Sequence, residues 1–72
     1  MLFPMNITFE TETEDDGRWL AEVPELPGVM AYGSTETEAI AKAEALALRV
    51  LAERLEQQET GPMNVQIVIA AE

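Results

Sequence analysis

The hydrophobic period of this chain changes twice, and these changes limit the folds that it can adopt. Before residue 34, apolar and polar residues alternate in short runs, which is typical of half-buried strands. Between residues 36 and 59, strong helix formers dominate and the apolar residues recur with a helical period. After residue 62 the alternation returns. The sequence therefore predicts three strands, one long helix and a fourth strand.

The alternation also predicts which side chains share a face of the sheet. The predicted strands cover residues 6–13, 18–23, 29–33 and 63–71, and the predicted helix covers residues 36–59. In the first strand, Ile7 and Phe9 fall on one face, whereas Glu10 and Glu12 fall on the other. One helix can cover only one face of a sheet, so the other face is left exposed or paired with a second copy.

Turn and capping residues mark the ends of these elements. Residues 15–17, Asp-Asp-Gly, favour a tight hairpin between the first two strands. Residues 24–28, Pro-Glu-Leu-Pro-Gly, must interrupt the pairing, because proline lacks a backbone donor. Thr35 and Glu38 have the spacing of a capping box, which predicts the helix start. Residues 61–62, Gly-Pro, predict its end.

Helical periodicity places seven apolar side chains on one broad face of the helix. They are Ala39, Ile40, Ala43, Leu46, Ala47, Val50 and Leu51. At ~1.5 Å per residue the helix would be roughly 35 Å long, which exceeds the length of a five-residue strand. We therefore expect its last turns to extend past the sheet.

The 72 residues are enough for one small domain, and its core is small for a stable fold. Small domains are commonly reinforced by disulfides, a metal or oligomerisation. The chain has no cysteine and no histidine, which removes disulfides, the usual zinc ligands and imidazole-based catalysis. We therefore expect a homodimer or a higher homo-oligomer, and no cofactor.

The charge balance limits the possible partners. Four basic residues against 14 acidic ones give a formal net charge of −10 and a pI near 4.1. Such a chain repels phosphate backbones and anionic membranes, so we expect no direct binding to nucleic acid or membrane. A basic protein would instead be attracted. Because the sequence has no long apolar run and no secretory pattern, we expect the protein to be cytoplasmic.

Two metal hypotheses are weak. Residues 12–17 follow the start of an EF-hand loop, but the twelfth position falls on Val23 and the flanking pattern is strand rather than helix. A nuclease site could draw on Glu10 or Glu12 and on Glu44. Residues 63–71 contain no acidic residue that would complete such a site.

Two segments together resemble the HicB-like antitoxin family. One is the hairpin that leads into the Pro-Glu-Leu-Pro-Gly turn, and the other is the Gly-Ser-Thr that opens a helix bearing Glu-Ala. The motif residues are Pro24, Leu26, Pro27, Gly28, Gly33, Thr35 and Glu38. Each of them also has a purely structural interpretation, as a turn or helix-start residue.

The resemblance implies a two-layer α+β fold, βββαβ, which is a partly degenerate ribonuclease-H-like domain without an active site. With a right-handed crossover, it predicts the strand order 3-2-1-4, the last strand parallel to the first. In two-domain relatives this domain blocks a small basic toxin ribonuclease of the HicA type, while a second domain binds DNA. Because the sequence stops at Glu72, we expect residues 1–72 to form a single HicB-like domain without a DNA-binding domain. Residual nuclease activity and an orphan oligomeric regulatory role are the alternatives.

The candidate partner-binding residues are an acidic group and an apolar group. The acidic group is Glu10, Glu12, Glu14, Asp15, Asp16 and Glu22, which crowd one hairpin. The apolar group is Trp19, Leu20, Met30 and Tyr32. An acidic patch would steer a cationic partner, and a desolvated apolar centre would supply affinity. Simple solvation of the hairpin is the alternative interpretation of the acidic group.

Overall fold

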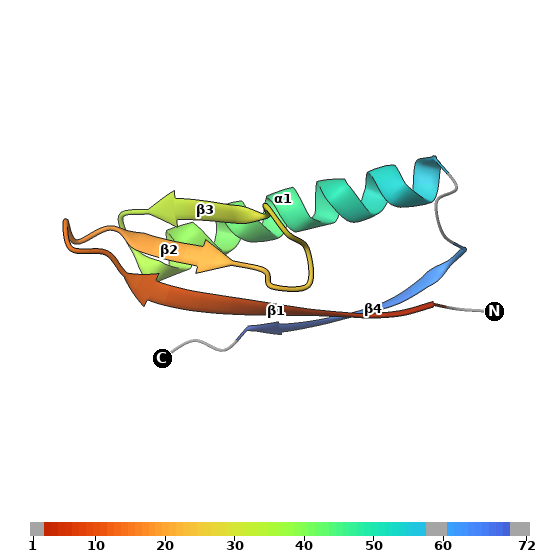
Figure 1. Ribbon diagram of the computed structural model, residues 1–72, viewed down its shortest axis with the longest axis horizontal. Helices are drawn as coiled ribbons and strands as arrows, with labels where there is room; N and C mark the ends of the chain where they lie inside the picture. Colours follow the sequence, from red (N-terminus) through yellow and green to blue (C-terminus); the bar gives the residue numbers. More distant parts are fainter. Residues whose placement is uncertain (1–2, 58–60, 70–72) are drawn as a thin grey trace.

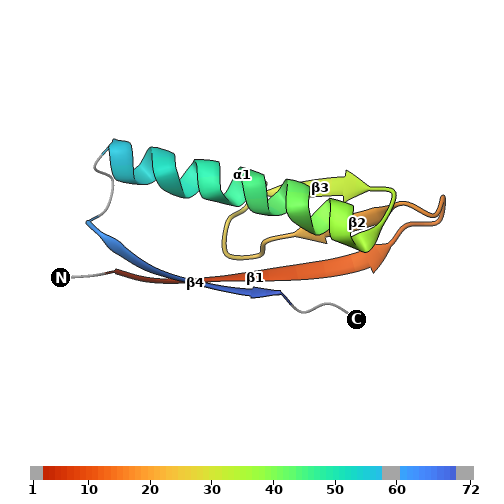
Figure 2. The same ribbon diagram turned by 180° about the vertical axis from the view of Figure 1, so that it is seen from behind.

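The computed structural model describes residues 3–57 and 61–69, and within them it contains four strands and one helix in the predicted order. The strands are β1 (Phe3–Thr13), β2 (Trp19–Glu22), β3 (Met30–Gly33) and β4 (Met63–Ile69), and the helix is α1 (Glu36–Glu56) (Figure 1). The helix lies on one face of a mixed four-stranded sheet, as the view from behind also shows (Figure 2). The predicted two-layer α+β fold is confirmed.

The strand order is β3-β2-β1-β4, as predicted. β1 pairs antiparallel with β2, β2 pairs antiparallel with β3, and β4 runs parallel to β1. β1 is longer than predicted because different parts of it serve two neighbours. Its residues 3–9 pair with β4, and its residues 10–13 pair with β2.

The helix is shorter than predicted at its C-terminal end. It ends at Glu56, where the N–H of Gln57 donates to the carbonyl oxygen of Glu53 at 2.9 Å. Residues 58–60 and the predicted end of the last strand at 70–71 lie outside the described residues. Of the seven residues on the predicted apolar face of the helix, Leu46 is the one that is exposed, at 37%. It lies at the margin of the helical face farthest from Ile40.

The core lies between α1 and the first three strands. Its largest fully buried side chains are Phe9, Ile7, Leu26 and Val23. The helix contributes small residues to this contact, and Gly33 allows it to approach β3 closely, since a Cβ at this position would stand 2.5 Å from the amide nitrogen of Ala39. Glycine at the end of β3 is therefore required by packing rather than by backbone conformation.

The Pro-Glu-Leu-Pro-Gly loop supports the core from the end of β2. Leu26 is 1% exposed, whereas both prolines are exposed. Gly28 has a φ of +89°, a conformation that side chains with a Cβ disfavour. The carboxylate of Glu25 accepts a hydrogen bond at 3.2 Å from the N–H of Thr8 in β1. Hydrogen bonds to its own N–H and to Thr8 hold the pKa of Glu25 below its usual value.

The helix start has the predicted cap with one difference. The Thr35 hydroxyl oxygen accepts a hydrogen bond from the N–H of Glu38 at 3.1 Å. The carboxylate of Glu38 reaches back to the N–H of Ser34 at 3.0 Å, one residue before the cap residue. It also pairs with Lys42 at 3.3 Å, and the Ser34 and Lys42 contacts lower the pKa of Glu38.

Candidate partner-binding face

The sheet face opposite α1 has no covering element among the described residues, and it carries six of the candidate side chains. Residues that stand directly opposite each other in neighbouring strands point to the same face. Ile7 and Phe9 are buried under the helix, so the alternate residues of β1 and their strand partners lie on the other side. The open face, as we name it, carries Glu10, Glu12, Leu20, Glu22, Met30 and Tyr32.

An apolar centre occupies β2 and β3 on the open face. Leu20 stands between Glu12 of β1 and Tyr32 of β3, and only 5% of it is exposed despite the absence of a covering layer. Its neighbours Met30 and Tyr32 are each 40% exposed. Tyr32 stands opposite Leu20 in the register, and the exposed side chains of Met30 and Tyr32 offer contact area to a partner.

Carboxylates line one side of this apolar centre. Glu10 in β1 stands directly opposite Glu22 in β2, and Glu12 follows two residues along on the same face. Together with Thr11, these three glutamates surround a shallow hollow of about 120 Å³. Like charges directly opposite each other destabilise a sheet. The pairing of Glu10 with Glu22 is therefore unfavourable for folding by itself.

Arg18 is the only basic residue of the hairpin, and it contacts Tyr32. Its guanidinium carbon lies 4.3 Å from the centre of the Tyr32 ring, and its Nε lies 2.7 Å from Oδ2 of Asp16. Both partners of this ion pair are more than half exposed, so the pair itself contributes little stability. A cationic side chain from a partner would have to displace or extend this stack on Tyr32.

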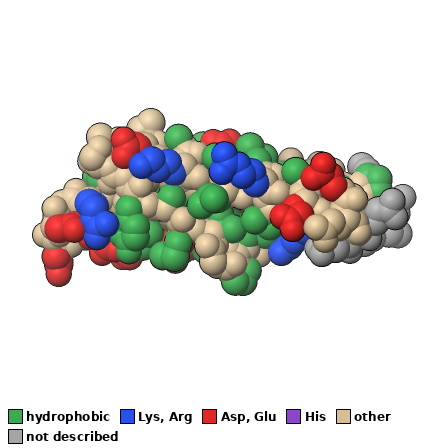
Figure 3. Space-filling model, turned by 90° about the horizontal axis from the view of Figure 1, so that it is seen from above, with side chains coloured by type: hydrophobic (Ala, Val, Ile, Leu, Met, Phe, Trp, Pro, Cys, Tyr) green, Lys and Arg blue, Asp and Glu red, His purple; other side chains and the backbone are tan. Residues whose placement is uncertain are grey.

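The remaining acidic candidates belong to the hairpin turn. Asp16 accepts hydrogen bonds from the N–H and the Nε of Arg18, and the backbone N–H of Arg18 is the main cause of its lowered pKa. The N–H of Glu14 donates to the Arg18 carbonyl oxygen at 2.7 Å, which closes the turn. Asp15 is exposed at the tip. Acidic and basic side chains lie together at the hairpin end of the molecule in the space-filling view (Figure 3).

Trp19 does not belong to the open face. It alternates with Leu20 along β2, and it packs, partly buried, against the core on the helix side of the sheet. The sequence alone grouped it with Leu20, Met30 and Tyr32 without assigning any of them to a face. The register places Trp19 and Tyr32 on opposite faces, since Tyr32 pairs with Leu20 and Trp19 pairs with Gly33.

Sequence reasoning also missed the contact of Arg18 with Tyr32 and the hydrogen bond of Glu25 with Thr8. The first had a signal, because Arg18 and Leu20 are two residues apart and therefore share a face of the predicted strand at residues 18–23. The second had none, because Glu25 lies in a loop whose path depends on the burial of Leu26.

The carboxylates considered for a nuclease site are not brought together. Glu10 and Glu12 lie on the open face, whereas Glu44 lies on α1 at the other side of the sheet. Among residues 3–57 and 61–69, no group of three or more acidic residues is placed to hold a metal ion. The hairpin at residues 14–18 has strands on both sides, unlike an EF-hand loop.

Comparison with known proteins gives no match to a family model, to a curated protein or to a solved structure. In the described part of the chain, no helix is long and apolar enough to cross a membrane.

Proposed function

We propose that this protein is a non-catalytic interaction module that binds a basic protein through the open face. The observation that carries the proposal is the combination of Leu20, Met30 and Tyr32 with a row of carboxylates on the uncovered side of the sheet. The resemblance to HicB-like antitoxins suggests the kind of partner, a small basic toxin ribonuclease of the HicA type. Binding would block the toxin by covering its surface.

The open face has the two parts that such binding requires. Affinity in protein interfaces comes mainly from a few well-packed side chains near the centre, with aromatic residues prominent among them. Met30 and Tyr32 are exposed enough to be desolvated by a partner. Surrounding charges contribute more to the rate of encounter, and the net charge of −10 attracts a cationic protein over the distance of a Debye length.

The unfavourable pairing of Glu10 with Glu22 supports the same proposal. A lysine or arginine placed between these carboxylates would relieve their repulsion and form charge-assisted hydrogen bonds. The repulsion raises the free energy of the free protein and so favours the complex with a basic side chain. Nucleic acid and anionic membranes would be repelled by the same residues, so we propose a protein partner in the cytoplasm and no cofactor.

The proposal predicts that the reading frame beside this chain's own encodes a small basic protein of the HicA type, and the direct test uses that protein. Association rates are measured at low and moderate salt for the wild type and for Glu10→Gln/Glu12→Gln/Glu22→Gln. The triple variant should associate more slowly and show a flatter salt dependence. A matched control is Glu44→Gln/Glu53→Gln/Glu56→Gln, which removes the same number of carboxylates from the helix.

The apolar centre is tested separately with Tyr32→Ala, which should mainly accelerate dissociation. If the control and the triple variant change the association rate equally, Glu10, Glu12 and Glu22 serve only to solvate the surface. Magnesium-dependent RNA cleavage that persists through purification, and is absent from a mock preparation, would instead favour a residual nuclease.

We also propose that copies of this chain associate with one another. The domain is small, it has no disulfide or histidine–cysteine metal site, and much of its apolar surface stays exposed. Sedimentation equilibrium at micromolar concentration should give a mass above 7.9 kDa. A folded monomer of that mass would contradict the proposal.

A further inference from the structure

β4 is an edge strand without the usual protection of an edge. It pairs with β1 on one side only, and no described residue pairs with its other side. Its seven residues, Met-Asn-Val-Gln-Ile-Val-Ile, include no charge and no proline. Natural sheets protect their edges with charges, prolines, bulges or very short strands. The other edge, β3, is only four residues long.

The side chains of β4 are also uncovered on the helix side of the sheet. Val65, Ile67 and Ile69 pair with Met5, Ile7 and Phe9, so they point toward the layer that contains α1. They are nevertheless 38%, 39% and 49% exposed. The helix is displaced toward β2 and β3, and no Cα of α1 lies within 8 Å of a Cα of β4.

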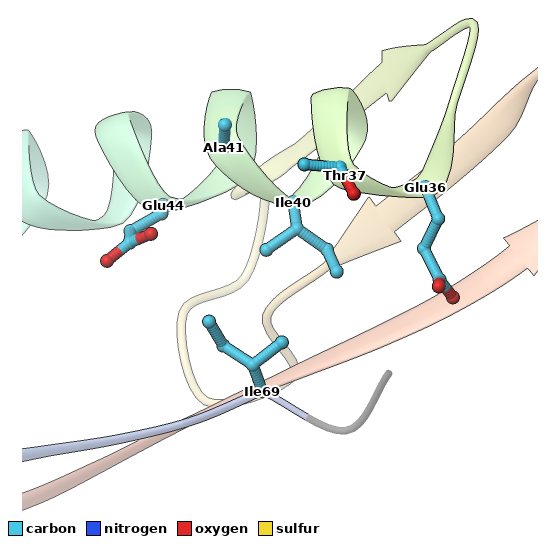
Figure 4. A pocket seen from close by; sticks show the side chains of 6 residues that line it. All are labelled: Glu36, Thr37, Ile40, Ala41, Glu44 and Ile69. Atoms are coloured by element: carbon cyan, nitrogen blue, oxygen red, sulfur yellow. The ribbon is translucent and has the colours of Figure 1, made fainter. Parts of the chain in front are cut away.

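A hollow lies between the end of β4 and the near flank of the helix. Ile69 and Ile40 point toward each other across this hollow of about 270 Å³, which Glu36, Thr37, Ala41 and Glu44 also line (Figure 4). Ala41 begins a stripe with a spacing of seven residues along the helix, which continues through Leu48 and Leu55. Leu48 is 47% exposed and Leu55 is 41% exposed.

We infer that β4 is the self-association surface and that it pairs antiparallel with β4 of a second copy around a two-fold axis. This inference rests on the proposed self-association and is independent of the basic partner. The pairing would join two sheets into one of eight strands, and the exposed apolar side chains of the two β4 strands would then lie next to each other. A two-fold interface must be self-complementary, and a neutral strand paired antiparallel with itself satisfies this condition.

The charge distribution favours a second copy of this chain as the partner of the free edge of β4. With a net charge of −10, two copies repel each other on most approaches. β4 carries no charged residue, and neither do residues 3–9 of β1, which pair with it, so this edge adds no repulsion of its own. Glu36 and Glu44 lie on the helix side of the hollow, and the acidic residues of β1 and β2 lie farther along the sheet, at Glu10, Glu12 and Glu22. A basic partner would instead be drawn to those acidic residues.

The register of the pairing follows from the length of β4 and the direction of its side chains. Residues opposite each other in an antiparallel pair share a face. The helices of both copies therefore lie on the same side of the joined sheet only if odd-numbered residues of β4 pair with odd-numbered residues of the second β4. Complete overlap of Met63–Ile69 then places Gln66 on the axis, opposite the partner subunit's Gln66. Met63 would face the partner subunit's Ile69, and Val65 would face the partner subunit's Ile67.

A cysteine cross-link tests this register directly, because the chain has no cysteine of its own. In the full chain, Gln66→Cys should form a disulfide-linked dimer on mild oxidation, since opposed Cα atoms lie about 4.5–5.5 Å apart, within disulfide range. Met30→Cys provides the matched control, because it is an exposed position on the other edge of the sheet. The cross-linked fraction should be high for the first variant and low for the second.

A charge insertion tests the same surface without a cysteine. Val68→Glu adds a carboxylate to β4 at a position that is 47% exposed, so the subunit should fold, as circular dichroism can verify. Its sedimentation mass should fall from twice 7.9 kDa to 7.9 kDa. Thr13→Glu adds the same charge at an exposed position of β1 beyond its pairing with β4, and it should remain dimeric.

The outcomes separate this inference from the proposals on which it depends. An oligomer that neither cross-links through Gln66→Cys nor responds to Val68→Glu overturns the β4 interface and leaves self-association intact. A monomeric wild type overturns both. Loss of binding to the basic toxin in Val68→Glu, with a monomeric wild type, would assign β4 to the toxin rather than to a second copy.

Discussion

Replacing Leu26 by alanine should destabilise the protein strongly, although Leu26 lies in a loop. Its side chain is 1% exposed and belongs to the core cluster with Val23 and Val29. Truncating a buried leucine to alanine costs about 2–5 kcal/mol, depending on how far the surroundings collapse into the cavity. At about 0.05–0.15 kcal/mol per residue, a chain of 72 residues has roughly 4–11 kcal/mol of stability in total.

The loop around Leu26 is held in a way that opposes collapse. Its N–H donates to the Val23 carbonyl oxygen, its carbonyl oxygen accepts from the N–H of Val29, and the N–H of Val23 donates to the Val29 carbonyl oxygen, each at 3.0 Å. Because these bonds fix both ends of the loop, the cavity should persist. We therefore expect Leu26→Ala to remove at least about 2 kcal/mol of the free energy of unfolding.

The measurement is urea denaturation followed by the fluorescence of Trp19, the only tryptophan, at constant protein concentration. Leu46→Ala is the matched control, since it makes the same chemical change at a helical position that is 37% exposed. It should cost clearly less, because much of that side chain is already in water. If Leu26→Ala costs no more than the control, the loop does not support the core as described.

Three further predictions concern packing, charge and pH. Gly33→Ala should destabilise the protein, because the added methyl group would lie 2.5 Å from the amide nitrogen of Ala39, and an unchanged melting temperature would contradict this close contact. Glu22→Gln should stabilise the free protein by about 0.2–1 kcal/mol through relief of its repulsion with Glu10, and a loss of stability in urea denaturation would refute that explanation. Glu25 has a pKa below its ordinary value of 4.5, so its contribution to stability is present above that value and is lost as the pH falls through the lowered pKa. The wild type should therefore exceed Glu25→Gln in stability at pH 7, with the difference vanishing in acid, and a difference independent of pH would count against the role of the Thr8 hydrogen bond.

Much of this fold is determined locally and could be predicted from the sequence. The alternation of Ile7 and Phe9 with Glu10 and Glu12 predicts both the first strand and its two faces, because a strand places successive side chains on opposite sides. The capping of the helix by Thr35 depends on residues only three apart. The strand order 3-2-1-4 could also be predicted, from the single right-handed crossover together with the resemblance to HicB-like antitoxins.

The tertiary structure decided which of these faces is covered. Alternation alone separates Trp19 from Leu20, but only the docking of α1 buries Trp19 partly and leaves Leu20 on the open face. In the same way, the strand register sets Glu10 against Glu22, a pairing between residues 12 positions apart whose register depends on the hairpin turn.

The displacement of the helix toward β2 and β3, away from β4, is the feature of the fold that is hardest to predict from the sequence. The pattern of Val65, Ile67 and Ile69 predicts a buried face, because apolar side chains alternate with polar ones. Gly33 and the small residues of α1 draw the helix close to β3 and β2, so one helix cannot also cover β4. Local patterns therefore determined the elements and their faces, whereas packing between distant segments determined which apolar surface was left for another molecule.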